Sequence, residues 1–392
     1  MQDWKKHKLG EIALLKRGYD LPDRLREKGN YQIISSSGVT DTHIEYKVEG
    51  PGVVTGRYGT IGKVFYTTKN FWPLNTSLYV KDFMGNDSKF IYYLLQTINW
   101  QSYSTKSAVP GIDRNEVHQE MVVVPPLQEQ ENIASILSAF DDKIELNLQM
   151  NKTLEEMAMA LYKHWFVDFG PFQNGKFVES ELGMIPEGWE VKSINSFGKI
   201  VCGKTPSKKD ENNFSSGQGY PFIKIPDMHG KVFVFETLEK ISKQGNKLQL
   251  NKLLPAGSVN ISCIATVGLV TINSLPAHTN QQINSIIPDY SSFKYYLYIS
   301  MLNLKDRFMN EASGGSATLN MNTSTFSSIE ILKPLNTELK EFDLLVSNLF
   351  EQINQNAIEN QTLTTLRDTL LPKLISGEVR VKDAKQMVAT AL

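Results

Sequence analysis

The residues with the greatest potential for chemistry are basic, amide and hydroxyl side chains, with two tyrosines, in short polar loops. Such side chains donate hydrogen bonds to phosphate oxygens and to base edges, so the chemistry they offer is recognition of a nucleic acid. The alternative is that these loops are ordinary solvated turns. The candidates in the first half of the chain are Arg17, Tyr19, Arg57, Tyr58, Lys63, Asn75, Thr76, Lys106 and Ser107. The candidates in the second half are Lys204, Thr205, Ser207, Lys208, Lys224, Thr266, Asn280, Gln281, Gln282 and Ser316.

No motif in the sequence predicts catalysis. The run from Gly56 to Lys63 resembles a phosphate-binding loop, but one residue too many separates Gly56 from Gly62, and Val64 replaces the hydroxyl residue that would hold magnesium. The run from Gly50 to Gly56 misses the dinucleotide-binding pattern by one residue. The sequence also lacks the His-Glu-x-x-His and Gly-x-Ser-x-Gly motifs. We therefore expect no catalytic residues and no enzyme activity in this chain.

Cysteine and histidine do not predict a metal site. Cys202 and Cys263 are the only cysteines and the six histidines are scattered, so we expect two buried free thiols and no metal. No stretch approaches 18 uncharged apolar residues, and no apolar segment follows the charged residues at the start. We therefore expect a cytoplasmic chain without a signal peptide or membrane span.

The chain has 392 residues and a net charge of −1, which argues against a strongly basic nucleic-acid binder. The charges are unevenly distributed, however. Residues 1–126 contain 16 basic and 13 acidic side chains, 127–165 contain 3 and 7, 166–335 contain 16 and 14, and 336–392 contain 6 and 8. Basic faces are therefore expected in the first and third segments, although ordinary solvated surfaces would also fit this pattern.

The two halves of the chain match in order. Residues 1–165 correspond to residues 189–376 at an offset that grows from 185 to 209. This period is far longer than a solenoid repeat, so each unit is a full domain with an appendage in a pseudo-twofold tandem repeat. Matched residues include Trp4 with Trp189, Gly18 with Gly203, Gly62 with Gly268, Asn75 with Asn280, Asn147 with Asn356, and Asn151 with Asn360.

Each unit begins with a mixed region in which short β-branched or aromatic runs, separated by Gly, Pro and Asn, predict strands around one helix. Both regions are expected to be compact α+β domains. The first has predicted strands at 31–35, 52–55, 61–66, 76–80 and 121–124 and a helix at 88–103. The second has predicted strands at 220–225, 257–261, 269–272, 283–287 and 328–332 and a helix at 293–309.

Each unit ends with a predicted long helix, at about 127–165 and 337–376, whose apolar residues follow a coiled-coil heptad. In the middle of each seam two asparagines replace apolar residues, and buried asparagine fixes helix register. We favour antiparallel pairing within the chain, with the asparagine layers opposite each other and the globular domains at opposite ends of the rod. The alternative is two unrelated amphipathic helices, each packed on its own domain. The register residues are Asn147, Asn151, Asn356 and Asn360.

The chain closely resembles the specificity (S) subunits of type I restriction-modification systems over nearly its whole length. The resemblance is carried by Pro125-Pro-Leu-Gln-Glu-Gln-Glu-Asn-Ile-Ala134, Trp165-Phe-Val-Asp-Phe169, Leu182-Gly-Met-Ile-Pro-Glu-Gly-Trp-Glu-Val191 and Leu371-Pro-Lys-Leu-Ile-Ser-Gly-Glu-Val379. One departure is that the second helix follows Pro334-Leu-Asn-Thr-Glu-Leu339 rather than the Pro-Pro-Leu-x-Glu-Gln pattern of the first.

The resemblance implies two target-recognition domains that each read one half of a split double-stranded DNA site. It also implies that the helices act as a spacer and dock two methyltransferase (M) subunits, with restriction (R) subunits in the full complex. S-adenosylmethionine, ATP and magnesium would then belong to the partner subunits, and this chain would be non-catalytic and without a cofactor. The expected boundaries are 1–126 and 169–335 for the domains, 127–168 and 336–378 for the helices, and 379–392 for a tail.

A different class of function also fits a repeated pair of domains joined by helices. The chain could be a structural coiled-coil connector with two ligand- or protein-binding lobes. Salt dependence separates the two hypotheses, because a DNA-binding protein loses affinity steeply as rising salt removes the gain from counterion release.

Overall fold

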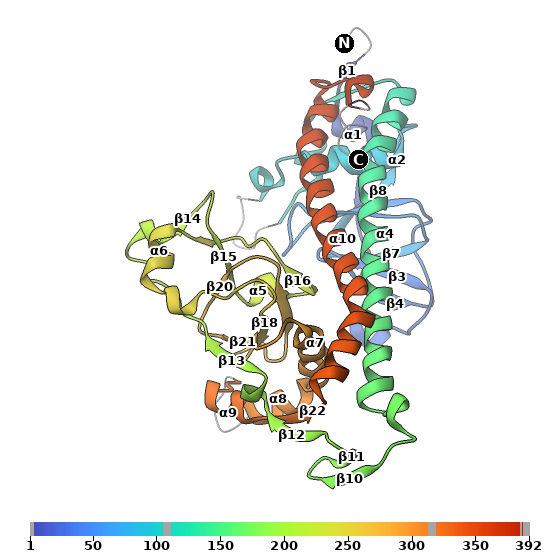
Figure 1. Cartoon of the computed structure of the whole chain (residues 1–392). Helices are drawn as coiled ribbons and strands as arrows, with labels where there is room; N and C mark the ends of the chain where they lie inside the picture. Colours follow the sequence, from blue (N-terminus) through green and yellow to red (C-terminus); the bar gives the residue numbers. More distant parts are fainter. Residues whose placement is uncertain (1–3, 105–110, 313–318, 385, 387–392) are drawn as a thin grey trace. The chain divides into compact units, whose positions relative to one another are not determined.

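The computed structural model describes residues 4–104, 111–312, 319–384 and 386. It divides into unit 1, made of Met1–Glu145 and Gln361–Leu392, and unit 2, made of Leu146–Asn360. Two long helices, α4 (Leu127–Phe166) and α10 (Asn336–Ser376), contribute to both units (Figure 1). No helix within the described residues is long and apolar enough to cross a membrane.

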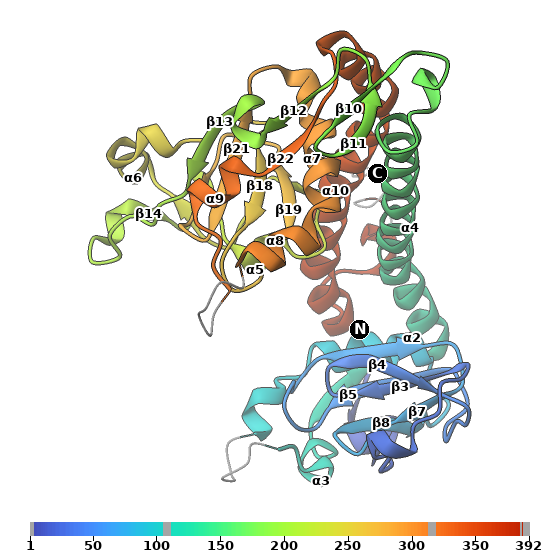
Figure 2. The ribbon, with the colours of Figure 1, turned by 90° about the horizontal axis from the view of Figure 1, so that it is seen from below.

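Unit 1 contains an antiparallel sheet in the order β2-β8-β5-β6, a smaller sheet β4-β3-β7 in which β3 and β7 are parallel, and the antiparallel pair β1-β9. Several of these strands are labelled in Figure 2. The strands are β1 (Lys5–Lys8), β2 (Leu14–Arg17), β3 (Tyr31–Ser35), β4 (Gly38–His43), β5 (Gly52–Gly56), β6 (Val64–Thr67), β7 (Phe71–Pro73), β8 (Ser77–Asp82) and β9 (Met121–Val124). The short helices are α1 (Leu9–Ile12), α2 (Ser88–Gln96) and α3 (Arg114–Val117).

Unit 2 contains a five-stranded sheet in the order β13-β21-β18-β19-β16, a four-stranded sheet β14-β17-β15-β20, and the pairs β12-β22 and β10-β11. The strands are β10 (Phe177–Ser180), β11 (Gly183–Pro186), β12 (Glu190–Ser193), β13 (Gly198–Cys202), β14 (Phe214–Ser215), β15 (Tyr220–Ile223), β16 (Phe233–Val234), β17 (Lys240–Ile241), β18 (Val259–Ser262), β19 (Val270–Asn273), β20 (His278–Thr279), β21 (Ile283–Pro288) and β22 (Glu330–Lys333). The helices are α5 (Ile225–Met228), α6 (Lys243–Leu248), α7 (Lys294–Asn303), α8 (Lys305–Ala312) and α9 (Thr323–Ser328).

The two units share one topology. The order β2-β8-β5-β6 in unit 1 corresponds to β13-β21-β18-β19 in unit 2. The outer pair repeats with the same register, because Lys5 pairs with Val124 and Glu190 pairs with Lys333, at offsets of 185 and 209. The tandem α+β repeat predicted from the sequence is therefore confirmed by strand pairing.

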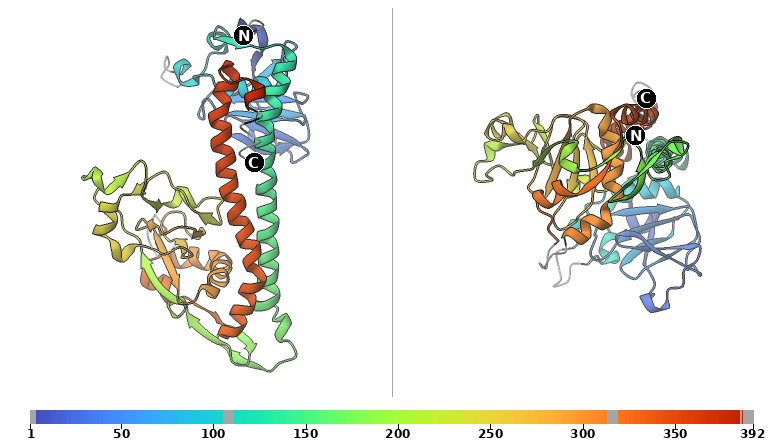
Figure 3. Two further views of the ribbon diagram at one scale, coloured as in Figure 1. Left: turned by 45° about the horizontal axis from the view of Figure 1, so that its top comes forward. Right: turned by 60° about the horizontal axis from the view of Figure 1, so that its bottom comes forward.

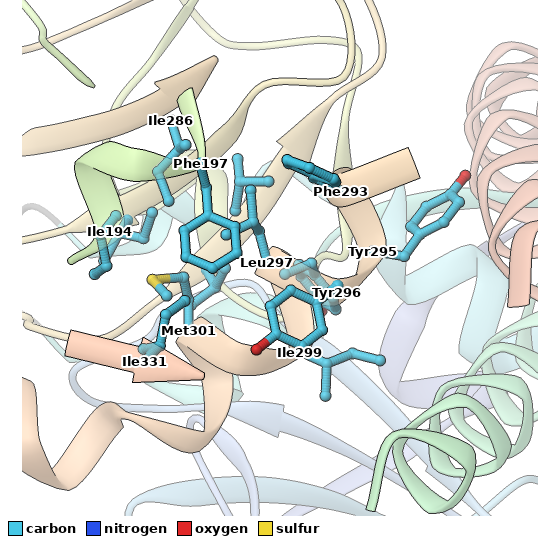
Figure 4. Packing of buried hydrophobic residues seen from close by; sticks show 14 of the residues in the cluster. Ile194, Phe197, Ile286, Phe293, Tyr295, Tyr296, Leu297, Ile299, Met301 and Ile331 are labelled. Carbon is cyan, nitrogen blue, oxygen red and sulfur yellow. The ribbon is translucent and has the colours of Figure 1, made fainter. Parts of the chain in front are cut away.

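Each unit buries one part of both long helices in its own core. In unit 1, Ile133 and Leu137 of α4 and Leu370 and Leu374 of α10 pack with the buried faces of α1 and α2. In unit 2, α4 and α10 pack against α7 and the larger sheet. Figure 4 shows the centre of this second core, where Phe197, Tyr296 and Ile286 converge from a turn, α7 and β21. The helices are therefore structural parts of both cores.

The two long helices lie side by side and run in opposite directions (Figure 3), as the heptad pattern predicts. In unit 2 the Asn147 side chain donates to the Asn360 side chain at 2.9 Å and to Glu359 at 2.6 Å. Asn356 donates to Asn151 at 2.8 Å, and Asn151 donates to the Ile353 carbonyl at 3.4 Å. The predicted amide layers therefore face each other and fix the register of the pair.

A charged residue in the seam of unit 1 is also neutralised. Arg367 occupies a heptad position and donates to the Asp141 carboxylate at 2.6 Å. Asp141 also accepts a 2.6 Å hydrogen bond from the Tyr93 hydroxyl of α2. Burial alone would lower the pKa of Arg367, but its hydrogen bonds and ion pairs with Asp141 and Asp368 outweigh burial and raise it. Asp141 thus joins α2, α4 and α10 of unit 1.

The segment that begins α4 fastens α2 to the long helix. The buried Gln130 side chain donates to the Pro125 carbonyl and to Asn86, and it accepts a hydrogen bond from the Asp87 backbone at 3.0 Å. Asp87 in turn caps α2. At the corresponding position of α10, Leu339 is fully buried in an apolar core. This difference explains why the second helix lacks the glutamine pattern of the first.

Several predicted elements have different bounds in the structure. The helix predicted at 88–103 ends at Gln96, because the Thr97 side chain bonds back to the Leu94 carbonyl and a 3₁₀ turn follows at Trp100–Tyr103. The helix predicted at 293–309 is interrupted at Leu304 and continues as α8 to Ala312. The strand predicted at 61–66 begins only at Val64, since Gly62 adopts a φ of +86° that a strand does not accept.

Two further predictions need correction. The strand predicted at 220–225 ends at Ile223, because α5 begins at Ile225 with Pro226 in its first turn. Only one thiol is buried. Cys263 lies inside the core of unit 2, which raises the pKa of its thiol to about 11, whereas Cys202 at the end of β13 is partly exposed.

The buried His278 predicts a pH-dependent stability for unit 2. Its ring lies between the side chains of Asn246 at 2.8 Å and Gln249 at 3.3 Å, and burial lowers its pKa from 6.5 to about 4. The unfolded chain therefore binds a proton between these values while the folded chain does not. Stability is fully present above about pH 6.5 and falls as the pH decreases toward 4.

We expect His278→Gln to reduce this loss, because the amide retains hydrogen-bonding capacity and does not titrate. Urea unfolding of both proteins at about pH 7.5 and about pH 5 measures the effect. An equal loss of stability in the variant and the unaltered chain would contradict the assignment.

Candidate nucleic-acid interface

In each unit two loops meet through a glycine. In unit 1 the Gly18 N–H donates to the Ser77 carbonyl at 3.1 Å, and in unit 2 the Gly203 N–H donates to the Ile283 carbonyl at 3.1 Å. A Cβ at Gly18 would lie 2.2 Å from the Leu74 carbonyl oxygen, and one at Gly203 would lie 2.2 Å from the equivalent oxygen of Asn280. Only glycine fits this approach, so the residue is dictated by backbone packing.

Polar side chains bridge the same two loops in both units. The Asn75 amide donates to the Asp20 carboxylate in unit 1, and the Thr205 hydroxyl donates to Gln281 at 2.8 Å in unit 2. Because the glycine contacts repeat at offsets of 185 and 206, Asn75 corresponds to Gln281. The predicted match of Asn75 with Asn280 is therefore wrong by one residue. The two units present different side chains at one equivalent position.

Tyr19 lies beside this junction and couples it to the sheet. Its hydroxyl is 3.1 Å from the hydroxyl of Tyr79 on β8, and the Lys16 ammonium lies 5.4 Å from its ring centroid. The hydrogen bond with Tyr79 lowers the pKa of Tyr19, whereas burial raises the pKa of Tyr79. The two hydroxyls therefore link the loop junction to β8.

A hollow of about 440 Å³ in unit 1 brings together three arginines. Arg17 comes from the end of β2, Arg57 and Tyr58 follow β5, and Arg114 begins α3. Leu78, Gly111, Ile112 and Asp113 complete the lining. The structure thus brings together Arg17, Arg57 and Tyr58 from the sequence-predicted set and adds Arg114, which the sequence analysis missed.

In unit 2 the candidate basic residues are more dispersed. Lys204 and Lys208 are exposed on the loop after β13, whereas the Lys224 ammonium donates to Glu239 at 2.5 Å. This hydrogen bond lowers the pKa of the Glu239 carboxyl. Ser207 lies in the loop after β13, with its carbonyl accepting from the Asn213 side chain at 3.0 Å.

The other candidates have varied surroundings. Lys63 and Thr266 are exposed in equivalent turns before β6 and β19. Asn280 is buried, and its amide donates to Gln282 at 2.9 Å. The Thr76 carbonyl accepts from the backbone N–H groups of Arg57 and Tyr58, a role that its residue type does not reveal. Lys106, Ser107 and Ser316 lie outside the described residues.

Comparison with known proteins decides the family. The model of the type I restriction modification DNA specificity domain matches residues 1–156 and again residues 186–367. The chain belongs to this family. The two matches correspond to the two copies of the shared topology described above.

Curated relatives and a solved structure agree with this family. The chain is 37% identical to the type I restriction enzyme HindI specificity subunit of Haemophilus influenzae, over 74% of this chain and 77% of the relative. It is 28% identical to the MjaIX specificity subunit of Methanocaldococcus jannaschii, over 79% and 74%. The S subunit structure from M. genitalium has a TM-score of 0.63 at 15% identity and covers 95% of this chain and 96% of that one, which shows a common fold. The chain is thus a specificity subunit of a type I restriction-modification system.

The specificity subunit should not tolerate a Cβ at the loop junction. We expect Gly203→Ala to reduce the free energy of unfolding by about 1–3 kcal/mol, because the new atom overlaps backbone oxygens that cannot rotate away. Gly217→Ala is the matched control, since a Cβ there meets nothing within 4 Å. Its effect should stay within about 0.5 kcal/mol. Equal urea-unfolding curves for the two variants would contradict the steric interpretation.

Proposed function

We propose that each unit of this specificity subunit binds one half of a bipartite site in double-stranded DNA. The observation that carries the proposal is the repeated loop junction, in which the same backbone contacts present different side chains. Asp20 and Asn75 occupy the positions that Thr205 and Gln281 occupy in the second unit. Side chains of these types bind base edges, and their difference would give the half-sites different sequences.

The proposed DNA-contacting residues are the candidates named from the sequence, some of which form these junctions. Exposed lysines and arginines would bind phosphates and set the orientation of the protein on the DNA. Residues held by internal hydrogen bonds would position adjacent side chains against the bases. The set comprises Arg17, Tyr19, Arg57, Tyr58, Lys63, Asn75, Thr76, Lys106, Ser107, Lys204, Thr205, Ser207, Lys208, Lys224, Thr266, Asn280, Gln281, Gln282 and Ser316.

The long helices are proposed to set the separation of the half-sites. Support comes from their uninterrupted lengths of 40 and 41 residues, each about 60 Å at 1.5 Å per residue. The facing amides at Asn147, Asn151, Asn356 and Asn360 oppose sliding of one helix along the other, because a shift would leave buried amides without partners.

The same helices are proposed to dock two methyltransferase subunits. In unit 2 they carry large apolar side chains on their exposed surfaces, and such patches are typical of protein interfaces. Catalysis would then reside in the partners, which would bind S-adenosylmethionine, with ATP and magnesium used by restriction subunits. The exposed residues are Leu146, Leu148, Met150, Met157 and Met159 on α4 and Leu344, Leu345 and Ile358 on α10.

Methylation mapping tests the role directly. A host without other methyltransferases would express this chain together with its methyltransferase partner, and its genome would be sequenced for modified bases. We expect one split motif with a fixed gap, which disappears when this chain is omitted. A soluble, intact complex that methylates no defined motif would contradict the proposal.

The spacing of the half-sites should be strict if the paired helices are stiff. Adding one base pair to the gap moves one half-site by about 3.4 Å and turns it by about 35°. We expect specific binding by the methyltransferase complex to fall to the level of scrambled DNA, a loss of roughly 10³-fold or more. Unchanged affinity for the lengthened site would exclude the proposal that the helices act as a spacer. Binding to each half-site alone is the control.

A further inference from the structure

The three-arginine hollow of unit 1 has the features of a single built recognition site. Arg17 and Arg114 have exposed side chains, whereas Arg57, which also lines the hollow, is half-buried. Two carboxylates are nearby: Asp113 lines the hollow, and Asp20 lies 3.3 Å from the Arg17 guanidinium. The arginines outnumber the carboxylates, so the hollow is basic as a whole and an anion is repelled only close to Asp113.

Arg57 is held through both its side chain and its backbone. Its guanidinium carbon lies 4.5 Å from the ring centroid of Tyr58, and its Nε–H donates to the Ile112 carbonyl at 3.4 Å. Its own backbone N–H donates to the Thr76 carbonyl at 2.9 Å. Because Nε already donates a hydrogen bond, the two terminal nitrogens of the planar guanidinium are the pair of donors that can bind a ligand.

Unit 2 holds the equivalent position with the same backbone contacts but a different side chain. Cys263 donates its N–H to the Gln282 carbonyl at 2.8 Å and accepts from the Met321 N–H at 2.9 Å, as Arg57 does with Thr76 and Ile112. The bridge of Tyr58 with Gly111 likewise recurs as Ile264 with Asn320. The buried thiol of Cys263 offers no such donor pair. The two units therefore share the backbone contacts at this position, but only unit 1 has a planar pair of donors there.

We propose that Arg57 recognises a guanine in the half-site bound by unit 1, while Arg17 and Arg114 bind the flanking phosphates. This inference rests on the proposed function and names the base that the hollow accepts. A planar pair of N–H donors matches the O6 and N7 acceptors of guanine in the major groove. A base edge carries no net charge, so it can approach Asp113 where a phosphate would be repelled. The exposed Arg114 can follow the backbone of the DNA, and Arg17 can exchange its exposed ion pair with Asp20 for a phosphate.

The test measures binding of the methyltransferase complex to every single-base variant of its mapped site. Arg57→Ala should reduce discrimination at one G·C pair in one half-site by about 10- to 100-fold and leave the other half-site unchanged. Arg57→Lys keeps the charge but loses the planar pair, so it should lose the same discrimination with an unchanged salt dependence. Arg114→Ala should weaken binding to all sequences equally and reduce the salt slope by about one phosphate contact.

Arg24→Ala is the matched control, because Arg24 is an exposed arginine of unit 1 that does not line the hollow. It should leave the discrimination at that G·C pair intact. Thermal unfolding of each variant separates loss of fold from loss of recognition.

The outcomes separate this inference from the proposed function. If the unaltered complex binds no split site, the proposed function fails. If the complex is specific but Arg57→Ala, correctly folded, weakens all sequences equally or changes nothing, only the assignment of Arg57 to a guanine is overturned.

Discussion

Burial of the seam between α4 and α10 is the constraint on which the rest of the structure depends. Neither helix can bury its apolar side chains within a single unit. Residues of both helices complete the core of unit 1 and also the core of unit 2. Apolar burial supplies affinity between helices but tolerates sliding by a turn. The polar residues remove that freedom, since Asn147, Asn151 and Arg367 each find a partner only in one register.

The repeated topology separates what the fold requires from what recognition varies. Gly18 and Gly203 are required by the same close backbone contact, and Gly62 and Gly268 adopt φ values of +86° and +87° in the same turn. These residues match in the sequence because no side chain replaces them without strain. Positions such as Arg57 and Cys263 share backbone hydrogen bonds but little chemistry. The same backbone fold can therefore present a different set of side chains in each unit.

The sequence predicted the features that depend on local periodicity. The two long helices, their facing asparagines and the repeat followed from heptads and matched spacings. It did not predict β1, because Lys5–Lys8 is entirely polar and becomes a strand only by pairing with Met121–Val124. The hollow was equally hidden, since Arg114 reaches Arg57 through tertiary folding across more than fifty residues. A signal was present in Asp113, which caps α3 as Asn322 caps α9 at the offset of 209.

The chain path of unit 1 has a consequence for the order in which the protein is made. Unit 2 is one continuous stretch, Leu146–Asn360, whereas unit 1 is completed by Gln361–Leu392 at the far end of the chain. While the ribosome is still translating, the first domain must wait with the apolar face around Ile133 and Leu137 uncovered until Leu370 and Leu374 emerge. The half that is synthesised first is therefore the half that is finished last.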